Sequence, residues 1–266
     1  MHGIGNDFIV IDCRTGTIPR LGSVLTKLSH RRFGIGFDQA LILLPSKRAD
    51  FRMDIYNGDG GRVEMCGNGI RCLAKYIWDR ELSANDPLTI ETLAGIIRPH
   101  RAGRQVKVDM GEPILNGESI PVEKSGQVVD YPLKAGGRKF LITAVSMGNP
   151  HCVIFVDDVD AFPLEQFGPL LETNPFFPER VNVEFVEVVS ARALKMRVWE
   201  RGAGETLACG TGACATVVAA TLKGLIGGRA TVNLKGGKLR IGWSKRDNHV
   251  FMTGPAEEVF EGEIEI

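Results

Sequence analysis

The chain has 266 residues, of which 32 are basic and 32 are acidic, so its formal net charge at pH 7 is zero. A neutral chain gives no sign of a nucleic acid or an anionic membrane as partner, and no apolar run approaches the roughly 20 residues of a membrane span. The N-terminus opens on a glycine turn instead of a basic and then hydrophobic leader, which predicts a cytoplasmic protein. A small molecule is the expected ligand.

Short segments rich in Val, Ile and Phe, each bounded by Gly, Pro, Asn or Asp, predict strands along the whole chain. In chain order they cover residues 8–12, 40–44, 51–56, 105–110, 151–156, 183–189, 194–199 and 249–253. Helical spacing is weak over 21–31 and clear over 69–79 and 211–223, and the two clear helices each start just after a cysteine. These elements predict an α+β fold in which strands wrap about one central helix in each half.

The two halves repeat each other at one fixed offset. Two cysteines stand in similar glycine frames, Met65-Cys66-Gly67-Asn68-Gly69 and Ala208-Cys209-Gly210-Thr211-Gly212, and 209 minus 66 gives 143. The same shift carries Gly5-Asn6 onto Gly148-Asn149, Gln39 onto Asn182, Asn57 onto Glu200 and Gly111 onto Gly254. We therefore expect two pseudo-symmetric lobes, residues 1–113 and 114–258, with residues 259–266 returning as a strand that pairs with the first lobe.

The position of each cysteine suggests acid–base chemistry. A cysteine ahead of a helix meets unsatisfied N–H groups and the positive end of the helix dipole, which favours the thiolate. Such positions lower the pKa from about 8.5 to as little as ~3.5. The following amides, of Gly67, Asn68, Gly210 and Thr211, are expected to converge on an anion such as an α-carboxylate. Thiols on opposite faces of one carbon, from Cys66 and Cys209, then predict stereoinversion without metal or pyridoxal phosphate.

Other interpretations of the cysteines remain open. A lone cysteine is most often a small buried hydrophobe, and that role is expected for Cys72 and Cys214. Five residues separate Cys66 from Cys72 and four separate Cys209 from Cys214, whereas structural zinc sites use tighter pairs, so no metal site is predicted. The alternatives are another cofactor-independent amino-acid racemase of the same fold and, from a different class, a redox switch or metal-binding module.

Beyond the cysteine frames, further motifs span nearly the whole chain: HGIGNDFIVID, GFDQ, IYNGDG, EMCGNGIRC, VDMGEP, GNPHCV, RVNVEF and ERGAGETLACGTGACA. In these motifs the chain resembles the diaminopimelate epimerase family. The resemblance implies a cofactor-independent enzyme that interconverts LL- and meso-diaminopimelate in lysine and peptidoglycan synthesis. It also implies the two-lobed fold of that family and a homodimer. Family members usually carry a few residues ahead of the Met-His-Gly turn at which this chain starts.

The same resemblance implies roles for individual residues. Cys66 and Cys209 become the acid–base pair, and the backbone of Gly67, Asn68, Gly210 and Thr211 becomes the cradle of the reacting carboxylate. His151 and Glu200 match positions that tune the thiols or orient the amino group. The substrate-binding positions are Asn6, Gln39, Asn57, Asn149, Asn182, Glu200 and Arg201, with Arg201 suited to the distal carboxylate. Taken singly, the asparagines beside glycine could be turn formers, and Glu200 with Arg201 a surface ion pair.

Overall fold

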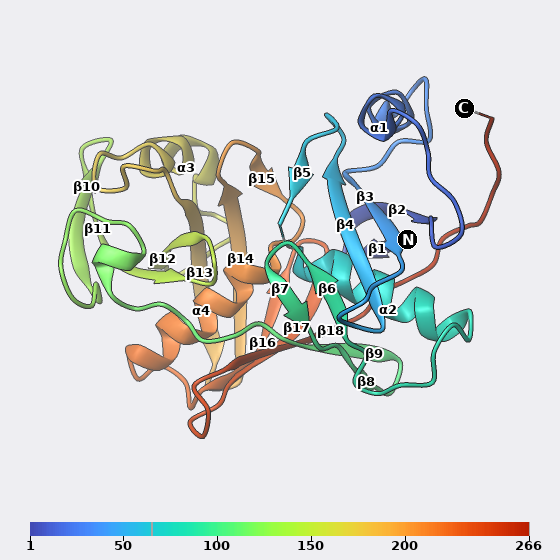
Figure 1. Ribbon diagram of the computed structural model, residues 1–266. Helices are drawn as coiled ribbons and strands as arrows, with labels where there is room; N and C mark the ends of the chain where they lie inside the picture. The colour runs from blue at the N-terminus through green and yellow to red at the C-terminus, as the bar shows by residue number, and fades with distance from the viewer. Residues whose placement is uncertain (65, 266) are drawn as a thin grey trace. The chain divides into compact units, whose positions relative to one another are not determined.

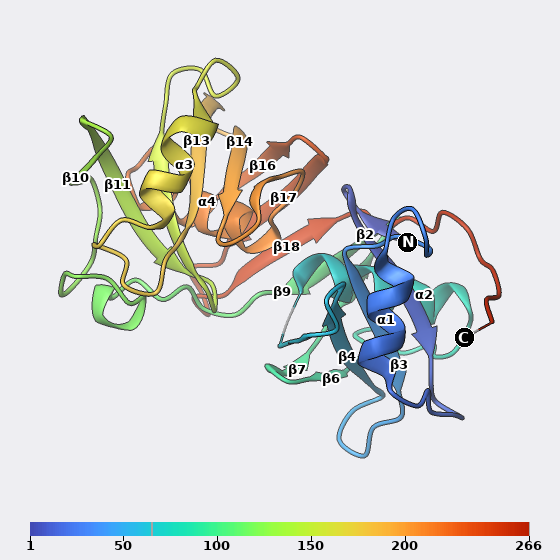
Figure 2. The same cartoon turned by 90° about the horizontal axis from the view of Figure 1, so that it is seen from above.

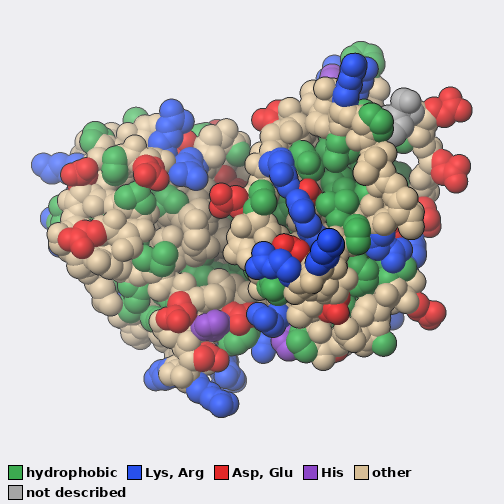
Figure 3. Space-filling model, viewed as in Figure 1, with side chains coloured by type: hydrophobic (Ala, Val, Ile, Leu, Met, Phe, Trp, Pro, Cys, Tyr) green, Lys and Arg blue, Asp and Glu red, His purple; other side chains and the backbone are tan. Residues whose placement is uncertain are grey.

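The computed structural model describes residues 1–64 and 66–265, so Met65 of the first cysteine frame and the terminal Ile266 lie outside the description. The chain divides into two compact units, Met1–Asp109 with Thr253–Ile266, and Met110–Met252. Both units are rich in strands and carry few helices, which confirms the predicted α+β class (Figure 1). Charged side chains of both signs are scattered over the visible surface of each unit (Figure 3).

The first unit is built on one sheet with the strand order β1-β2-β3-β4-β6-β7, and β5 pairs with β4. Strands β2 and β3 are parallel, whereas β8 and β9 form an antiparallel hairpin. Its elements are β1 (His2–Gly3), β2 (Asn6–Asp12), α1 (Leu21–Ser29), β3 (Gln39–Leu44), β4 (Phe51–Asn57), β5 (Arg62–Val63), α2 (Gly67–Asp79), β6 (Ile90–Thr92), β7 (Gly95–Ile97), β8 (His100–Ala102) and β9 (Gln105–Asp109).

Strand β3 is apolar from Ala40 to Leu44 because both of its faces are covered. Side chains alternate along a strand, so Ala40 and Ile42 point to one face, where they join a cluster with Leu25 of α1. Leu41 points to the other face, where its Cδ2 atom would lie 2.9 Å from a Cβ added to Gly69 of α2. Figure 2 shows α1 lying across the sheet of this unit. Helices α1 and α2 therefore cover opposite faces of β3.

The second unit repeats this plan on a longer sheet, with the order β10-β11-β12-β13-β14-β16-β17-β18 and β15 paired with β14. Strands β12 and β13 are parallel, like β2 and β3. Its elements are the 3-10 helix η1 (Gly117–Ser119), β10 (Tyr131–Ala135), β11 (Arg138–Ser146), β12 (Pro150–Phe155), α3 (Leu164–Glu172), β13 (Asn182–Ser190), β14 (Ala193–Glu200), β15 (Gly204–Thr206), α4 (Gly210–Leu222), β16 (Arg229–Leu234), β17 (Gly237–Trp243) and β18 (Val250–Gly254).

The internal repeat extends to the helices. Leu21 and Leu164 begin α1 and α3, and Gly67 and Gly210 begin α2 and α4; both pairs differ by 143. Helix α3 was not predicted because Gly168 and Pro169 interrupt its helical spacing. Gly168 is needed there, since a Cβ at this position would lie only 2.6 Å from the Trp199 ring. The repeat itself was a signal for α3, because it carries the predicted helix at 21–31 onto this segment.

The predicted returning strand at 259–266 is wrong. Residues 258–265 form no strand, and Ile266 lies outside the described residues. The chain returns earlier, where His2 and Glu257 form an antiparallel bridge with N–O distances of 2.8 and 2.9 Å. The apolar members of the alternating tail are not covered, since Val259 is 63% and Phe260 69% exposed. An alternating pattern makes a stable strand only where one face is buried.

Several strands were not predicted, including the hairpin formed by β10 and β11, which turns at Gly136 and Gly137. The exposed charged residues Arg138 and Lys139 at the start of β11 dilute the apolar pattern. Across residues 1–64 and 66–265, the helices are too short or too polar for a membrane crossing.

Candidate active site

In the first unit, Cys66 is the N-cap of α2. Its backbone is extended, with φ −139° and ψ 112°, and its Sγ accepts a hydrogen bond from the amide of Gly69 at 3.4 Å. Asn6, at the start of β2, reaches the same point: its Oδ1 accepts from Cys66 Sγ at 3.8 Å and from Asn68 Nδ2 at 3.3 Å. The structure therefore brings together three predicted site residues, a thiol and two amides, at the positive end of a helix.

Gln39 and Asn57 form a second polar pair of this unit. They are opposite residues of the antiparallel strands β3 and β4, and Gln39 Nε2 donates to Asn57 Oδ1 at 2.9 Å. Gln39 Oε1 is buried and accepts no hydrogen bond from any described residue. A buried acceptor without a donor is costly, so this oxygen suits a ligand that brings N–H groups, such as an ammonium.

Two residues that the sequence analysis did not single out hold these amides in place. Asp38 Oδ2 accepts from Asn6 Nδ2 at 2.9 Å. Arg71 is fully buried, and its guanidinium donates to Asn68 Oδ1 at 3.0 Å and to the Gly67 carbonyl at 3.1 Å. Both lie inside the motifs already quoted, GFDQ and EMCGNGIRC. The sequence signal for Arg71 was an arginine between the apolar residue Ile70 and Cys72 in the first turns of the predicted helix.

In the second unit, Cys209 caps α4 in the same way. Its φ is −125° and its ψ 111°, and its Sγ accepts from the amide of Gly212 at 3.3 Å and lies 3.5 Å from Thr211 Oγ1. The side chain is more enclosed than that of Cys66, which is half-buried, since Cys209 is only 5% exposed. The two helix starts therefore share their backbone geometry and differ in their surroundings.

Two carboxyl groups approach Cys209. Glu200, the last residue of β14, accepts a hydrogen bond from Thr206 Oγ1, and the Cys209 thiol is within hydrogen-bonding reach of the same carboxyl. Burial raises the pKa of Glu200, and the hydrogen bond from Thr206 opposes this only in part. The second carboxyl belongs to Glu184, on β13.

The prediction that a helix start lowers the thiol pKa is wrong for Cys209. Burial raises the pKa of Cys209 well above its ordinary value, and the charges of Glu200 and Glu184 raise it further. Hydrogen bonds from Thr211 and the Gly212 amide act in the opposite direction but are weaker. Desolvation and neighbouring negative charge thus outweigh the helix terminus, so Cys209 holds its proton at neutral pH.

His151 joins Glu184 and Asn149 in a chain of polar contacts. Its Nδ1 is 2.7 Å from Glu184 Oε1, and its Nε2 is 3.0 Å from Asn149 Oδ1. His151 and Glu184 are both 0% exposed. Glu184 was not among the predicted site residues, although RVNVEF was quoted as a motif. Its signal was an acid with apolar residues on both sides, in the run Val183-Glu184-Phe185-Val186.

Asn182 and Arg201 are tied to the protein itself. Asn182 Nδ2 donates to the Pro150 carbonyl at 3.0 Å, and its Oδ1 accepts from the backbone amide of Arg201 at 2.9 Å. Both ends of this buried amide are therefore engaged, so it fixes the backbone of Arg201. The Arg201 guanidinium is exposed and donates to the Glu179 carbonyl at 3.1 Å, which leaves further donors for an anion.

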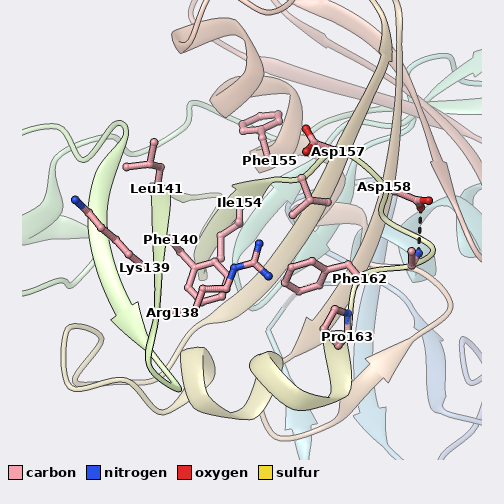
Figure 4. A pocket seen from close by; sticks show the side chains of 12 residues that line it. Arg138, Lys139, Phe140, Leu141, Ile154, Phe155, Asp157, Asp158, Phe162 and Pro163 are labelled. Atoms are coloured by element: carbon pink, nitrogen blue, oxygen red, sulfur yellow. Dashed lines mark hydrogen bonds between the residues drawn. The ribbon is translucent and has the colours of Figure 1, made fainter.

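The predicted site residues do not line the surface pocket of the second unit shown in Figure 4. There the Arg138 guanidinium lies over the rings of Phe140 and Phe162, at 5.2 and 5.4 Å. This pocket contains no cysteine or histidine. In the part of the chain that the structure describes, no three His, Cys, Asp or Glu side chains are grouped to hold a metal ion.

Comparison with known proteins identifies the family. The model of the family described as diaminopimelate epimerase matches residues 1–116 and 143–259. The chain belongs to the diaminopimelate epimerase family. A protein of that name from Acetivibrio thermocellus is 52% identical over 100% of this chain and 97% of its own length, and one from Synechocystis sp. is 54% identical over 100% and 97%. The relatives are thus named as isomerases that act on an amino acid.

Solved structures with lower identity show the same fold. A phenazine biosynthesis protein of the PhzF family from Bacillus anthracis matches with a TM-score of 0.71 at 19% identity, covering 100% of this chain and 95% of its own. A hydroxyproline epimerase from Agrobacterium vitis matches with a TM-score of 0.65 at 16% identity, covering 96% and 87%. These likenesses confirm the predicted diaminopimelate epimerase-like architecture and carry no information on the substrate of this family member.

Proposed function

We propose that this chain interconverts LL- and meso-diaminopimelate by proton transfer at the α-carbon, without a cofactor, in the supply of lysine and peptidoglycan precursors. The observation that carries the proposal is the 52% identity, over the whole chain, with a protein named diaminopimelate epimerase. The structure supports it chemically, because each unit places one cysteine at a helix start. The hydroxyproline epimerase that shares the fold is only 16% identical, so it gives no comparable support for a proline-like substrate.

The proposed chemistry divides the work between two thiols. One takes the α-proton as thiolate while the other, as thiol, gives a proton to the opposite face. The half-buried Cys66 is assigned as the base at rest. Cys209 is assigned as the acid, because its raised pKa keeps the proton on sulfur. When the other stereoisomer is the substrate, the two roles exchange, so the pair titrates as a unit.

The helix starts are assigned the task of stabilising the negative charge that develops on the substrate carboxylate. In α2 and α4 the first amides belong to Gly67, Asn68, Gly210 and Thr211, and they have no acceptor within their own helix. Donors fixed in advance cost no reorganisation when the charge forms, which is the largest catalytic effect in many enzymes. The Gln39 and Asn57 amides and the Arg201 guanidinium are assigned to the distal ammonium and carboxylate of diaminopimelate.

The homodimer implied by the family resemblance and the cytoplasmic location expected from the N-terminal sequence stay predictions. Light scattering on the purified chain tests the first, because a dimer doubles the 29.0 kDa mass of one chain.

The function is tested by proton NMR of meso-diaminopimelate in deuterium oxide with purified protein and no added cofactor. We expect the α-proton signal to disappear, since each turnover takes a proton from carbon and returns a deuteron from a solvent-exchanged thiol. Treatment with EDTA should leave the rate unchanged. A persistent α-proton signal with folded protein would contradict the proposal, and loss of exchange with EDTA would contradict its metal-free chemistry.

A further inference from the structure

The internal repeat pairs each residue around Cys209 with a residue of the first unit, and that residue serves as a reference. Under the shift of 143, His151 corresponds to Phe8 and Glu184 to Leu41, because 151 minus 8 and 184 minus 41 both give 143. The two glycines of the helix starts, Gly69 and Gly212, correspond in the same way. The first unit therefore shows what the fold places at these positions when they carry no charge.

Leu41 and Glu184 occupy corresponding places beside the starts of their helices. In the first unit, a Cβ added to Gly69 would lie 2.9 Å from Leu41 and 3.4 Å from Phe8. In the second unit, a Cβ added to Gly212 would lie 2.6 Å from Glu184 Oε1. The space beneath the helix start thus holds an apolar pair in one unit and a carboxylate–imidazole pair in the other.

Packing does not explain the charged pair. Phe8 is 4% exposed and Leu41 0%, so the apolar pair makes a buried core in the first unit. Burial of a carboxylate costs several kcal/mol unless it is compensated, and a well-packed apolar pair is often the more stable choice. Glu184 Oε2, moreover, accepts no hydrogen bond from any residue in the described chain. The fold does not need a carboxylate at this position, and one oxygen of Glu184 is left without a hydrogen bond. Both observations point to a role of Glu184 in function.

The surroundings of Glu184 indicate that role. The titratable groups that face it are His151 and Cys152 on β12, Glu200 on β14 and Cys209 on α4. Only the imidazole can donate a hydrogen bond to Glu184 and at the same time carry positive charge. The other three are acids, and a second negative charge near any of them disfavours its ionisation.

We propose that Glu184 is a positioning residue of this site: it holds His151 against Asn149 and keeps the shared proton on Cys209 in the resting enzyme. Oε1 fixes the ring through Nδ1, so Nε2 faces the Asn149 amide. The carboxylate also lies against the first turn of α4, whose N-cap is Cys209. The inference rests on the proposed function, because it explains which of the two thiols carries the proton.

The test replaces Glu184 by glutamine, which keeps the shape and the hydrogen-bond acceptor but removes the charge. The readout is the midpoint pH at which Cys209 reaches half of its maximal reactivity toward a small alkylating reagent. Mass spectrometry of the peptide that contains Cys209 measures this reactivity. We expect this midpoint to fall by about one pH unit, and the alkaline limb of kcat/KM to move with it. The value of kcat should fall by about tenfold, less than the removal of an acid or base group costs.

Two further variants separate charge from position. Glu184→Asp keeps the charge but shortens the reach to His151, so we expect a nearly unchanged Cys209 midpoint with a reduced kcat. Leu41→Met, at the corresponding position of the first unit, is the matched control and should leave the Cys209 midpoint unchanged. If Glu184→Gln does not fold, the double variant with His151→Phe and Glu184→Leu copies the pair of the first unit, and it should lower the midpoint as well.

An unchanged Cys209 midpoint in Glu184→Gln, or an equal fall in Glu184→Asp, overturns the proposal. The alkylation needs no substrate, so its outcome is independent of the proposed reaction. If the wild-type protein fails to exchange the α-proton of diaminopimelate, the proposed function falls. If it exchanges and the midpoint does not move, only the role of Glu184 falls.

Discussion

The starts of α2 and α4 have the same backbone and different chemical surroundings. Each is capped by a cysteine whose Sγ accepts from the amide three residues on, at 3.4 Å in one unit and 3.3 Å in the other. Around Cys66 the duplicated positions carry Phe8, Leu41 and Asn57, whereas around Cys209 they carry His151, Glu184 and Glu200. Duplication thus provides two equivalent helix starts, and divergence of their neighbours places the two thiols in different chemical surroundings, which raise the pKa of Cys209.

The largest effect is expected from removing either thiol. If both are needed, Cys66→Ala and Cys209→Ala should each lower the epimerisation rate by about 10²–10⁴-fold, the usual contribution of an acid or base group. The rate is measured from the conversion of LL- to meso-diaminopimelate. Cys13→Ala, at a buried cysteine outside the site, is the control and should retain activity. A single variant with near-normal epimerisation would show that the two helix starts do not share the reaction.

A smaller effect is expected from making the second site resemble the first. Glu200→Asn copies Asn57 and removes a charge that raises the pKa of Cys209, so that pKa should fall by about one unit. The alkaline limb of the kcat/KM profile then moves to lower pH, because Cys209 loses the proton that it donates at a lower pH. We expect kcat/KM to fall by about 10²-fold as well.

The control for this variant is Glu205→Gln. The Glu205 carboxylate is paired with Arg197 and Lys235, both at 2.7 Å, so its charge is already balanced. Its removal should leave the alkaline limb in place. Equal shifts in the two variants would mean that the net charge of the unit, and not the Glu200 carboxyl beside Cys209, determines the pH of the alkaline limb.

The smallest effect concerns stability. Gly69→Ala places a methyl group 2.9 Å from Leu41, and Gly212→Ala places one 2.6 Å from the Glu184 carboxylate. Overpacking of this kind costs about 1–3 kcal/mol in the free energy of unfolding, measured by urea denaturation. We expect the larger loss at Gly212, because the distance is shorter and His151 holds the carboxylate.

Gly227 provides the matched control, since no heavy atom lies within 4 Å of a Cβ added there. Gly227→Ala should change the free energy of unfolding by less than about 0.5 kcal/mol. A larger loss in Gly69→Ala than in Gly212→Ala would contradict the view that Glu184 is held rigidly under α4.

The sequence was informative where a repeat or a period could be counted. The repeat matched the two cysteine frames, and helical spacing placed a helix directly after each of them, where the structure has α2 and α4. The sequence misled where tertiary burial decides the outcome. A helix start favours a thiolate in general, yet enclosure and two carboxylates reverse this at Cys209. The contacts of Glu184 with His151 and of Asp38 with Asn6 join segments far apart in the sequence, so local patterns could not reveal them. The tail at 259–265 has the alternation of a strand but nothing to cover it.

The most direct measurement of the difference between the two sites is the pH dependence of alkylation at Cys66 and Cys209 in one wild-type sample. Peptide-resolved mass spectrometry gives each thiol its own midpoint, and midpoints are independent of how fast a buried site reacts. We expect Cys66 to become half-reactive at a lower pH than Cys209, whose midpoint should lie well above the ordinary thiol range of about 8.5. Coincident midpoints, or a lower one at Cys209, would contradict the assignment of the resting base and acid.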